Sequence, residues 1–413
     1  MRDPGPDPEP DVAELRLQLR RHPADRYPVQ HATAAFHLGS LHLQRDRVPA
    51  ALELLDMAHA GFGRAGLRLE QAKAELMLGV ALRAAGRPAD AREALSGAMG
   101  TFAELGQDAE QAAAAYNLGL VAGAEGDGEA ARDALTRARE LFLEARHVAQ
   151  AGSATRELAT SLLTAGEAGA AVPLLVEALE LSSRGGDGSG AGGAANVLGL
   201  AHLAMEDPTS AVTAFTEAVV LHPRSVRPAE HAMAKANLAL ALQRAGDLPR
   251  ARLAALQALA TSGADGPVVE QGRSLLAQLP RTGGVLFAVL DAEPPDRWQS
   301  VVRDEVLRWI DSAPAVQRRE AGDWVQGVLA RPGAAPALGE ALLGVLLELP
   351  PPDYAAVVAL VVRAAGRCEE PEAERFRAFT RSSMARFALP QLQRMAGTFD
   401  QAATDAGEPA RWS

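Results

Sequence analysis

A run of glycines at residues 188–193, Gly188-Ser-Gly190-Ala-Gly192-Gly193, has the G-x-G-x-x-G spacing of a dinucleotide-binding turn. In such turns, glycines let the backbone approach a pyrophosphate, and the turn joins a strand to a helix. Here the preceding segment has helical periodicity, as described below, and the run lacks the lysine of a phosphate-binding loop. We therefore interpret the run as a flexible loop between helical repeats and expect no cofactor.

Four histidines lie close together in the sequence, His31, His37, His42 and His59. At 100° per residue, His31 and His42 share a helix face while His37 points elsewhere. No cysteine or acidic residue joins them at metal-ligand spacing. We expect ordinary surface or inter-repeat histidines, and no metal site.

The C-terminal part lacks the side chains that usually act as general bases. It has no histidine after residue 231 and no lysine after residue 235. The only cysteine, Cys368, precedes Glu369 and Glu370, which disfavour a reactive thiolate. Catalysis there would need carboxylates alone, and no pair stands out. We therefore expect that the protein is not an enzyme.

The 413-residue chain carries 41 basic and 52 acidic residues, a net charge of −11. This balance gives no electrostatic footprint for nucleic acid or an anionic membrane. No apolar run approaches the ~20 residues of a membrane span, and the Pro- and Asp-rich N-terminus is not a signal peptide. A single cysteine fits a reducing compartment. These features predict a cytoplasmic protein, and the Ala-, Gly- and Arg-rich composition is typical of a high-GC bacterial genome.

The sequence has an internal 40-residue repeat, in which the same residue types return at the same spacing. Each unit has a leucine followed by a small residue, then an alanine, a large apolar residue and a second alanine at helical spacing. The leucines are Leu38, Leu78, Leu118, Leu158, Leu198 and Leu238. The alanines are Ala51, Ala91, Ala131, Ala171, Ala211 and Ala251, and then Ala58, Ala98, Ala138, Ala178, Ala218 and Ala258. Between them lie Leu55, Leu95, Leu135, Leu175, Phe215 and, as the one small member, Ala255.

This pattern predicts two helices in each unit. The i, i+4, i+7 spacing of the second half marks one helix face, and the leucine lies on a preceding helix. Glycines at 86, 126, 166 and 246 separate the two halves in four units, as residues that accept a positive φ. Small residues let the helices approach closely. A single helix hairpin cannot bury its apolar face by itself, so neighbouring units must stack.

These positions resemble the tetratricopeptide (TPR) repeat signature. The usual period is about 34 residues, whereas the 40-residue period of this chain resembles the long-helix variety. The resemblance covers residues 31–279. The chain departs from the signature at two positions. Where a Trp is usual, the six repeats have Ala35, Glu75, Ala115, Thr155, Ala195 and Lys235. Where a Pro is usual, only Pro223 lies nearby. The resemblance implies an all-α TPR solenoid of six helix hairpins, and the family binds proteins or peptides.

We expect three parts in the chain. Residues 1–30 form a tail with a short capping helix over 11–21, and residues 31–280 form the solenoid, which ends in a capping helix up to residue 279. Arg281–Gly284 is a hinge, and residues 284–413 form a smaller helical domain that holds all four tryptophans. Its expected helices are 295–311, 315–330, 336–349, 353–366, 371–387 and 390–405.

The resemblance also implies a binding surface. In TPR superhelices, the side of each first helix that faces away from the anchor leucine lines a concave groove, where Asn and basic residues bind peptides. An amide can bind a peptide backbone, and a guanidinium can bind a carboxylate. We expect the partner-binding residues to be exposed and to form one row: Lys73, Tyr116, Asn117, Arg156, Asn196 and Asn237. Leu120, Leu200 and Leu240 lie among them, which favours a helical or apolar-containing peptide.

The leading hypothesis is a non-enzymatic scaffold that binds a partner protein or peptide in this groove. One alternative is a peptide- or ligand-responsive regulator, resembling bacterial TPR receptors, whose C-terminal helices are the output. Another is an enzyme with its site between solenoid and C-terminal domain, which a pocket there with buried carboxylates would favour. The sequence leaves the partner, the pathway and the oligomeric state open, a homodimer included.

Overall fold

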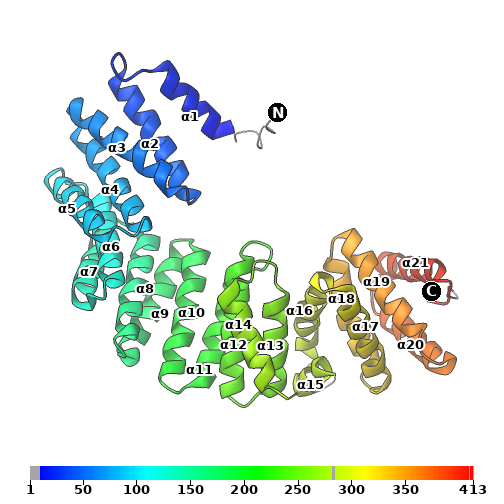
Figure 1. Ribbon diagram of the computed structural model, residues 1–413. Coiled ribbons are helices and arrows are strands. Elements are labelled where there is room, and N and C mark those ends of the chain that lie inside the picture. Colours follow the sequence, from blue (N-terminus) through cyan, green and yellow to red (C-terminus); the bar gives the residue numbers. More distant parts are fainter. Residues whose placement is uncertain (1–9, 281–283, 409, 413) are drawn as a thin grey trace. The chain divides into compact units, whose positions relative to one another are not determined.

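The computed structural model describes residues 10–280, 284–408 and 410–412. In these ranges the chain forms 21 α-helices and one short 3-10 helix, with no strand (Figure 1). They divide into two compact units, Met1–Asp207 and Pro208–Ser413, which are described separately. No helix among the described residues is long and apolar enough to cross a membrane. The structure thus confirms the expected all-α class.

Unit one consists of ten helices. They are α1 (Pro10–Arg21), α2 (Pro28–Gln44), α3 (Val48–Arg64), α4 (Arg68–Ala84), α5 (Pro88–Glu104), α6 (Asp108–Ala124), α7 (Gly128–Glu144), α8 (Val148–Thr164), α9 (Ala168–Arg184) and α10 (Gly188–Ala204). The first of these, α1, is the expected N-terminal capping helix.

Unit two contains the remaining helices. They are α11 (Pro208–Leu221), α12 (Pro228–Arg244), α13 (Leu248–Ala260), α14 (Gly266–Gln278), α15 (Val285–Ala292), η1 (Pro295–Arg297), α16 (Trp298–Asp311), α17 (Pro314–Leu329), α18 (Ala335–Glu348), α19 (Pro351–Ala365), α20 (Glu370–Met384) and α21 (Leu389–Ala406). The six expected C-terminal helices match α16–α21. Helix α15 was not expected, and residues 281–283 of the expected hinge lie outside the described residues.

The predicted 40-residue period is confirmed by the helix starts. First helices begin at residues 28, 68, 108, 148, 188 and 228, and second helices begin at residues 48, 88, 128, 168, 208 and 248. The fifth repeat divides between the units, with α10 in unit one and α11 in unit two. The turns recur twice in each period. A residue of positive φ follows nearly every helix from α2 to α12. These residues are Asp46, Gly66, Gly86, Gly106, Gly126, Arg146, Gly166, Gly186, Glu206 and Gly246.

Three hairpins of unit one, α2–α3, α4–α5 and α6–α7, have a close crossing of their two helices at a glycine. A Cβ atom placed on Gly79 of α4 would lie 2.7 Å from Cγ of Leu95 on α5. On Gly119 of α6 it would lie 2.6 Å from Cγ of Leu135 on α7. Carbon atoms do not approach so closely, so a glycine at this position sets the distance between the helices.

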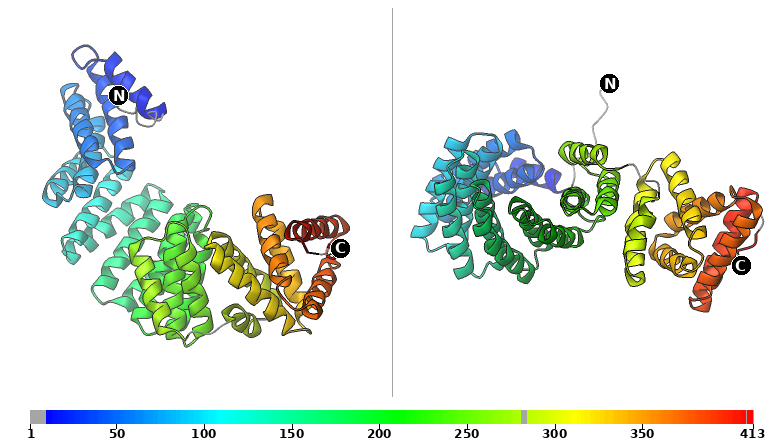
Figure 2. Two further views of the ribbon diagram at one scale, coloured as in Figure 1. Left: turned by 45° about the vertical axis from the view of Figure 1, so that its right-hand side comes forward. Right: turned by 90° about the horizontal axis from the view of Figure 1, so that it is seen from below.

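The alanines of the repeat lie where helices meet. Ala91, Ala98 and Ala138 are fully buried, and Ala131 is 1% exposed. The first helices α2, α4, α6 and α8 contact one another along unit one, while the second helices α3, α5, α7 and α9 are further apart. The stack therefore curves with its first helices on the inner side (Figure 2). We call this side of unit one the inner face.

The glycine run at residues 188–193 is helical, so its interpretation as a flexible loop was wrong. It forms the first turns of α10, and Asp187 caps the helix by accepting a hydrogen bond of 2.9 Å from the Gly190 backbone N–H. A Cβ atom on Gly190 would lie 2.9 Å from Oγ of Ser182 on α9. The small residues here serve close helix packing, and α9, which is not a strand, precedes them.

Two histidines stabilise a longer turn that occurs twice, once before α2 and once before α12. Nδ1 of His31 lies 2.8 Å from the backbone oxygen of His22, and Nδ1 of His231 lies 2.9 Å from that of His222. In each case a His-Pro pair ends the preceding helix early, and a proline begins the next one. This turn shows that α1 corresponds to a second helix of the repeat, like α11.

The C-terminal helices of unit two pack mainly with every second neighbour. Helix α18 contacts α16 and α20, and α19 contacts α17 and α21. A continuous apolar core runs from Leu253 on α13 through Trp309 and Trp324 to Trp412. Large apolar residues of α16 and α20, among them Val306, Trp309 and Phe376, belong to this core. The helices after residue 284 thus share their core with the last TPR hairpin.

The helix crossing predicts opposite effects for one substitution at two glycines of unit one. Gly119→Ala should lower the free energy of unfolding by ~1–3 kcal/mol, because the new methyl group overlaps the buried Leu135. Gly100→Ala on α5 should raise it by ~0.5–1 kcal/mol, because a Cβ there meets no atom within 4 Å. Denaturant unfolding measures both, and equal shifts of the same sign would contradict the argument.

Candidate functional site

Lys73 and Tyr116, two of the predicted binding residues, link neighbouring first helices of the inner face. Nζ of Lys73 on α4 lies 3.2 Å from a carboxylate oxygen of Glu110 on α6. Tyr116 on α6 hydrogen-bonds Arg156 on α8, and burial followed by the charge of Glu157 raises its pKa. Both residues therefore stabilise the stack, and the side chain of Lys73 is still 40% exposed.

Asn117 and Arg156 lie on the inner face but are less exposed than expected. The side-chain amide of Asn117 donates a 2.9 Å hydrogen bond to the Ala113 backbone oxygen on its own helix. The Arg156 guanidinium lies 2.7 Å from Oε1 of Glu157, and its side chain is 24% exposed. A Cβ atom on Gly193 of α10 would lie 2.8 Å from Nη1 of Arg156. Arg156 is thus held between α6, α8 and α10.

The last two predicted residues differ in their surroundings. Asn196 on α10 is half-buried and has an interaction partner. The expected exposure of Asn237 was wrong, since it is 8% exposed and its Oδ1 accepts a 3.2 Å hydrogen bond from Gln271 on α14. Helix α14, which occupies the place of a seventh first helix, packs over Asn237. The sequence spacing alone does not show this contact. Asn237 belongs to unit two, so only the other five candidates share the inner face.

An open groove of about 440 Å³ lies one helical turn beyond Tyr116 and Arg156. Its walls are α6 and α8, and its floor is the start of α7, so it opens toward the inner face. We call it the Gly123 groove. Its lining residues are Gly119, Leu120, Gly123, Ala124, Gly126, Gly128, Ala131, Leu135, Glu157, Thr160, Ser161, Thr164 and Ala165.

Small residues at the end of α6 leave this groove open. The position five residues after the anchor leucine is occupied by Leu43, Arg83, Gly123, Leu163, Leu203 and Gln243 in the six repeats. Only the third repeat has a glycine there, followed by Ala124. The polar side chains of the first helices do not indicate this groove, because it arises from a missing side chain at position 123.

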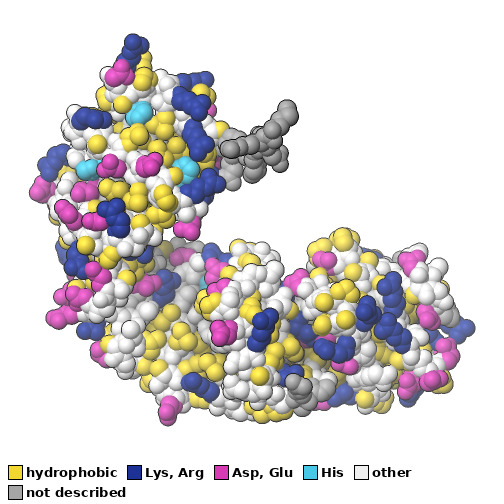
Figure 3. All heavy atoms as spheres, viewed as in Figure 1, with side chains coloured by type: hydrophobic (Ala, Val, Ile, Leu, Met, Phe, Trp, Pro, Cys, Tyr) yellow, Lys and Arg dark blue, Asp and Glu magenta, His cyan; other side chains and the backbone are white. Residues whose placement is uncertain are grey.

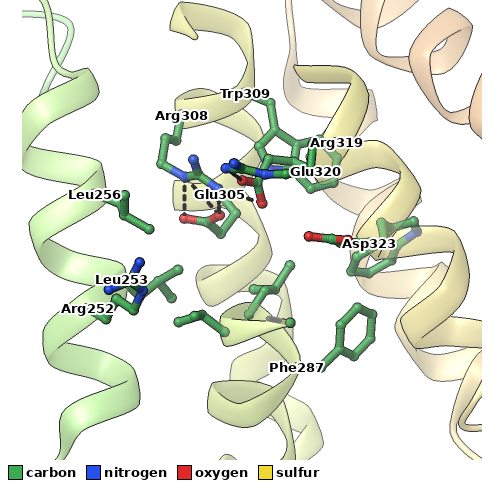
Figure 4. Close-up of a pocket in the computed structure, with 14 residues that line it drawn as sticks. Arg252, Leu253, Leu256, Phe287, Glu305, Arg308, Trp309, Arg319, Glu320 and Asp323 are labelled. Carbon is green, nitrogen blue, oxygen red and sulfur yellow. Dashed lines mark hydrogen bonds and ion pairs between the residues drawn. The ribbon is translucent and has the colours of Figure 1, made fainter. Parts of the chain in front are cut away.

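A second cavity, of about 240 Å³, lies inside unit two between α13, α15, α16 and α17 (Figure 4). We call it the α13–α17 pocket. It is lined by Arg252, Leu253, Leu256, Gly284, Val285, Leu286, Phe287, Glu305, Arg308, Trp309, Arg319, Glu320, Asp323 and Trp324. It lies between the last TPR hairpin and the C-terminal helices.

A buried ionic network forms one wall of the α13–α17 pocket. Glu305 is fully buried, and Arg308 is 3% exposed and donates to both Glu305, at 2.7 Å, and Glu320, at 2.9 Å (Figure 4). Burial acts to lower the pKa of Arg308, but the charges and hydrogen bonds of the two carboxylates outweigh it and raise the pKa. Arg308 is therefore a charged, fully engaged side chain.

The network continues into the last TPR hairpin. Nε2 of Gln257 on α13 donates a 3.0 Å hydrogen bond to Glu305. Nζ of Lys235 on α12 donates to Oε1 of Gln257 at 2.8 Å and to Asp304 on α16 at 2.6 Å. Lys235 stands where a TPR usually has its tryptophan, so the sixth repeat has replaced an apolar contact with an ionic one.

Two carboxylates of the α13–α17 pocket, those of Glu305 and Glu320, are engaged in the ionic network. Glu305 and Glu320 both bind Arg308, which leaves neither free to exchange a proton with a substrate. The thiol of Cys368 lies elsewhere, and burial, aided by Glu372, raises its pKa and disfavours the thiolate.

The buried network predicts a large loss of stability on removal of one carboxylate. Glu305→Ala should lower the free energy of unfolding by ~3 kcal/mol or more, because it leaves the Nε2 donor of Gln257 and part of Arg308 buried without an acceptor. As a control, Glu340→Ala removes an exposed partner of Arg386 and should cost ~1 kcal/mol or less. Denaturant unfolding followed by tryptophan fluorescence measures both losses, which should differ at least threefold if the network has this role.

On the face seen in Figure 3, acidic and basic side chains are interspersed. This distribution agrees with the near balance of 41 basic and 52 acidic residues. An interspersed surface of this kind suits a protein partner better than a polyanion.

Comparisons with known proteins agree with the repeat architecture. The tetratricopeptide repeat family model matches residues 76–142 and 196–267. Among solved structures, the apo form of RapI is 10% identical over 97% of this chain and 98% of its own, with a TM-score of 0.44. BtubC (BKLC) from P. vanneervenii is 15% identical over 65% of this chain and 95% of its own, with a TM-score of 0.43.

A third structure contains the nearly identical TPR-like repeats of a putative kinesin light chain from Podosopora anserina. It is 17% identical over 51% of this chain and 97% of its own, with a TM-score of 0.38. A search of curated proteins finds no match. The chain therefore carries tetratricopeptide repeats within residues 76–267, built as helix hairpins with a 40-residue period.

Proposed function

We propose that this protein is a non-enzymatic scaffold that binds a segment of a partner protein in the Gly123 groove. The observation that supports this proposal is the groove itself, an open hollow of about 440 Å³ on the inner face of a TPR stack. TPR domains generally bind proteins. A hollow between two first helices gives the side chains of a partner segment a place to be buried.

The lining of the groove favours an apolar, uncharged stretch of the partner. Its floor consists of small and apolar side chains, among them Ala131 and Leu135. The hydroxyls of Thr160 and Thr164 already donate to backbone oxygens of their own helix, at 2.9 Å each. Glu157 already binds Arg156. The polar groups are therefore largely engaged, and buried apolar area supplies most of the affinity.

Asn117 and Lys73 would bind the parts of the partner that extend beyond the groove. Asn117 lies one turn from Leu120 on the same helix, and its oxygen can accept a hydrogen bond while its amide remains bound to Ala113. Lys73 is exposed enough to reach a carboxylate. Arg156 has a different role, since it positions α6 against α8 above the groove.

Filling the groove should abolish binding without loss of stability. Gly123→Leu places a side chain in the hollow, and a Cβ atom there meets only Ala131, at 3.9 Å. The substitution also improves helix propensity by up to ~1 kcal/mol. We expect the full-length variant to capture at least tenfold less partner from a lysate of its host, measured by quantitative mass spectrometry.

Gly100→Leu on α5 is the matched control. It adds the same side chain to an exposed helical glycine of unit one that does not line the groove. Capture by this variant should equal that of the wild type. If Gly123→Leu captures the same proteins in the same amounts as Gly100→Leu, the groove is not the binding site and the proposal is wrong.

A further inference from the structure

We propose that the α13–α17 pocket binds a small apolar amino acid, with its carboxylate at Arg252, its ammonium group at Asp323 and its side chain against the aromatic wall. This site is separate from the Gly123 groove and lies in the other unit of the chain. The inference rests on the size of the cavity and on polar groups that line it without partners.

The cavity has the size and the walls for a small molecule with an apolar body. Its volume of about 240 Å³ is below the ~300–1,000 Å³ of pockets for drug-sized ligands. Its apolar walls are Leu253, Leu256, Leu286, Phe287, Trp309 and Trp324. The rings of Phe287 and Trp324 lie 5.5 Å apart, which gives a continuous aromatic surface. A ligand of amino-acid size would bury its side chain there.

Two buried donors of this pocket lack an acceptor. Nη1 of Arg252 and Nε1 of Trp309 are buried and have no hydrogen-bond partner among the described residues. Trp309 is 1% exposed, so water does not readily satisfy its indole. Both groups can only donate. An unmade hydrogen bond of a buried donor is costly, and a carboxylate is the strongest acceptor for a guanidinium.

One carboxylate of the pocket is also without a partner in the described part of the chain. Asp323 projects from α17 into the pocket, on the side opposite Arg252 (Figure 4). Partial burial and the nearby Glu320 raise its pKa, whereas Arg319 acts to lower it. Arg319 instead donates to Glu320, at 2.7 Å. Asp323 lies at the exposed edge of the pocket, where its carboxylate is open to a ligand cation.

The charges that remain free select the ligand class. Glu305, Arg308, Arg319 and Glu320 bind one another. Arg252, with its buried Nη1, and Asp323, at the exposed edge, are left on opposite sides of the pocket (Figure 4). A zwitterion with an apolar side chain complements this arrangement, whereas a simple carboxylate or a simple amine would leave one of the two charges without a partner.

Isothermal titration calorimetry of the full chain tests this ligand class directly. The probes are phenylalanine, leucine, 3-phenylpropanoate, which lacks the amine, and phenethylamine, which lacks the carboxylate. We expect at least one of the two amino acids to bind, and 3-phenylpropanoate and phenethylamine to bind at least tenfold more weakly than it. Binding of neither amino acid at millimolar concentration, or equal binding of 3-phenylpropanoate, would overturn the proposal.

Variants at the two free charges locate the site. Arg252→Met and Asp323→Asn should each weaken amino-acid binding at least tenfold, and neither removes an existing ion pair. Arg318→Met on α17 is the control, since Arg318 is exposed and does not line the pocket. If Arg252→Met does not fold, as judged by its thermal midpoint, Asp323→Asn at the exposed edge provides the test alone. Binding unchanged in the folded variants would show that the site lies elsewhere.

Discussion

The close crossing of the two helices in the first three hairpins is the constraint on which the TPR region of unit one depends. A glycine such as Gly119 brings one helix so near its partner that Leu135 fits against bare backbone. The buried alanines then let neighbouring hairpins stack at the same short distance. The repeats still bury large side chains such as Phe102 and Phe215. The four tryptophans lie in or just after the C-terminal helices, which pack by a different pattern.

Much of this fold could be predicted from the sequence because small residues recur at a fixed spacing. The Leu-Gly pairs and alanines defined the six hairpins and the 40-residue period. The recurrence of the turns at half that period was missed, since Asp46, Arg146 and Glu206 adopt positive φ without being glycine. Helix α15 was also missed, because its short, continuously apolar sequence carries no helical periodicity. Its place is set by packing on α13.

The candidate sites were harder to predict, for physical reasons. The helical wheel placed Lys73, Asn117 and Arg156 on one side of the first helices, but it could not show that Arg156 is engaged between three helices. The Gly123 groove is formed by absent side chains, and the α13–α17 pocket by helices far apart in sequence. Beside the pocket, Lys235 and Glu305 belong to one network although they lie on α12 and α16, with three α-helices and one 3-10 helix of the chain between them. Sequence spacing carries no information about such contacts.

Site-specific photo-crosslinking tests the proposed role of the inner face most directly. A photoreactive amino acid at Ala124 would stand inside the Gly123 groove, and the same residue at Gly100 would stand on the second helix α5. Irradiation of the full-length protein in its host should then crosslink a partner at position 124, through an apolar segment of that partner, and not at position 100. Crosslinks at position 100 with none at position 124 would contradict the assignment of partner binding to the inner face.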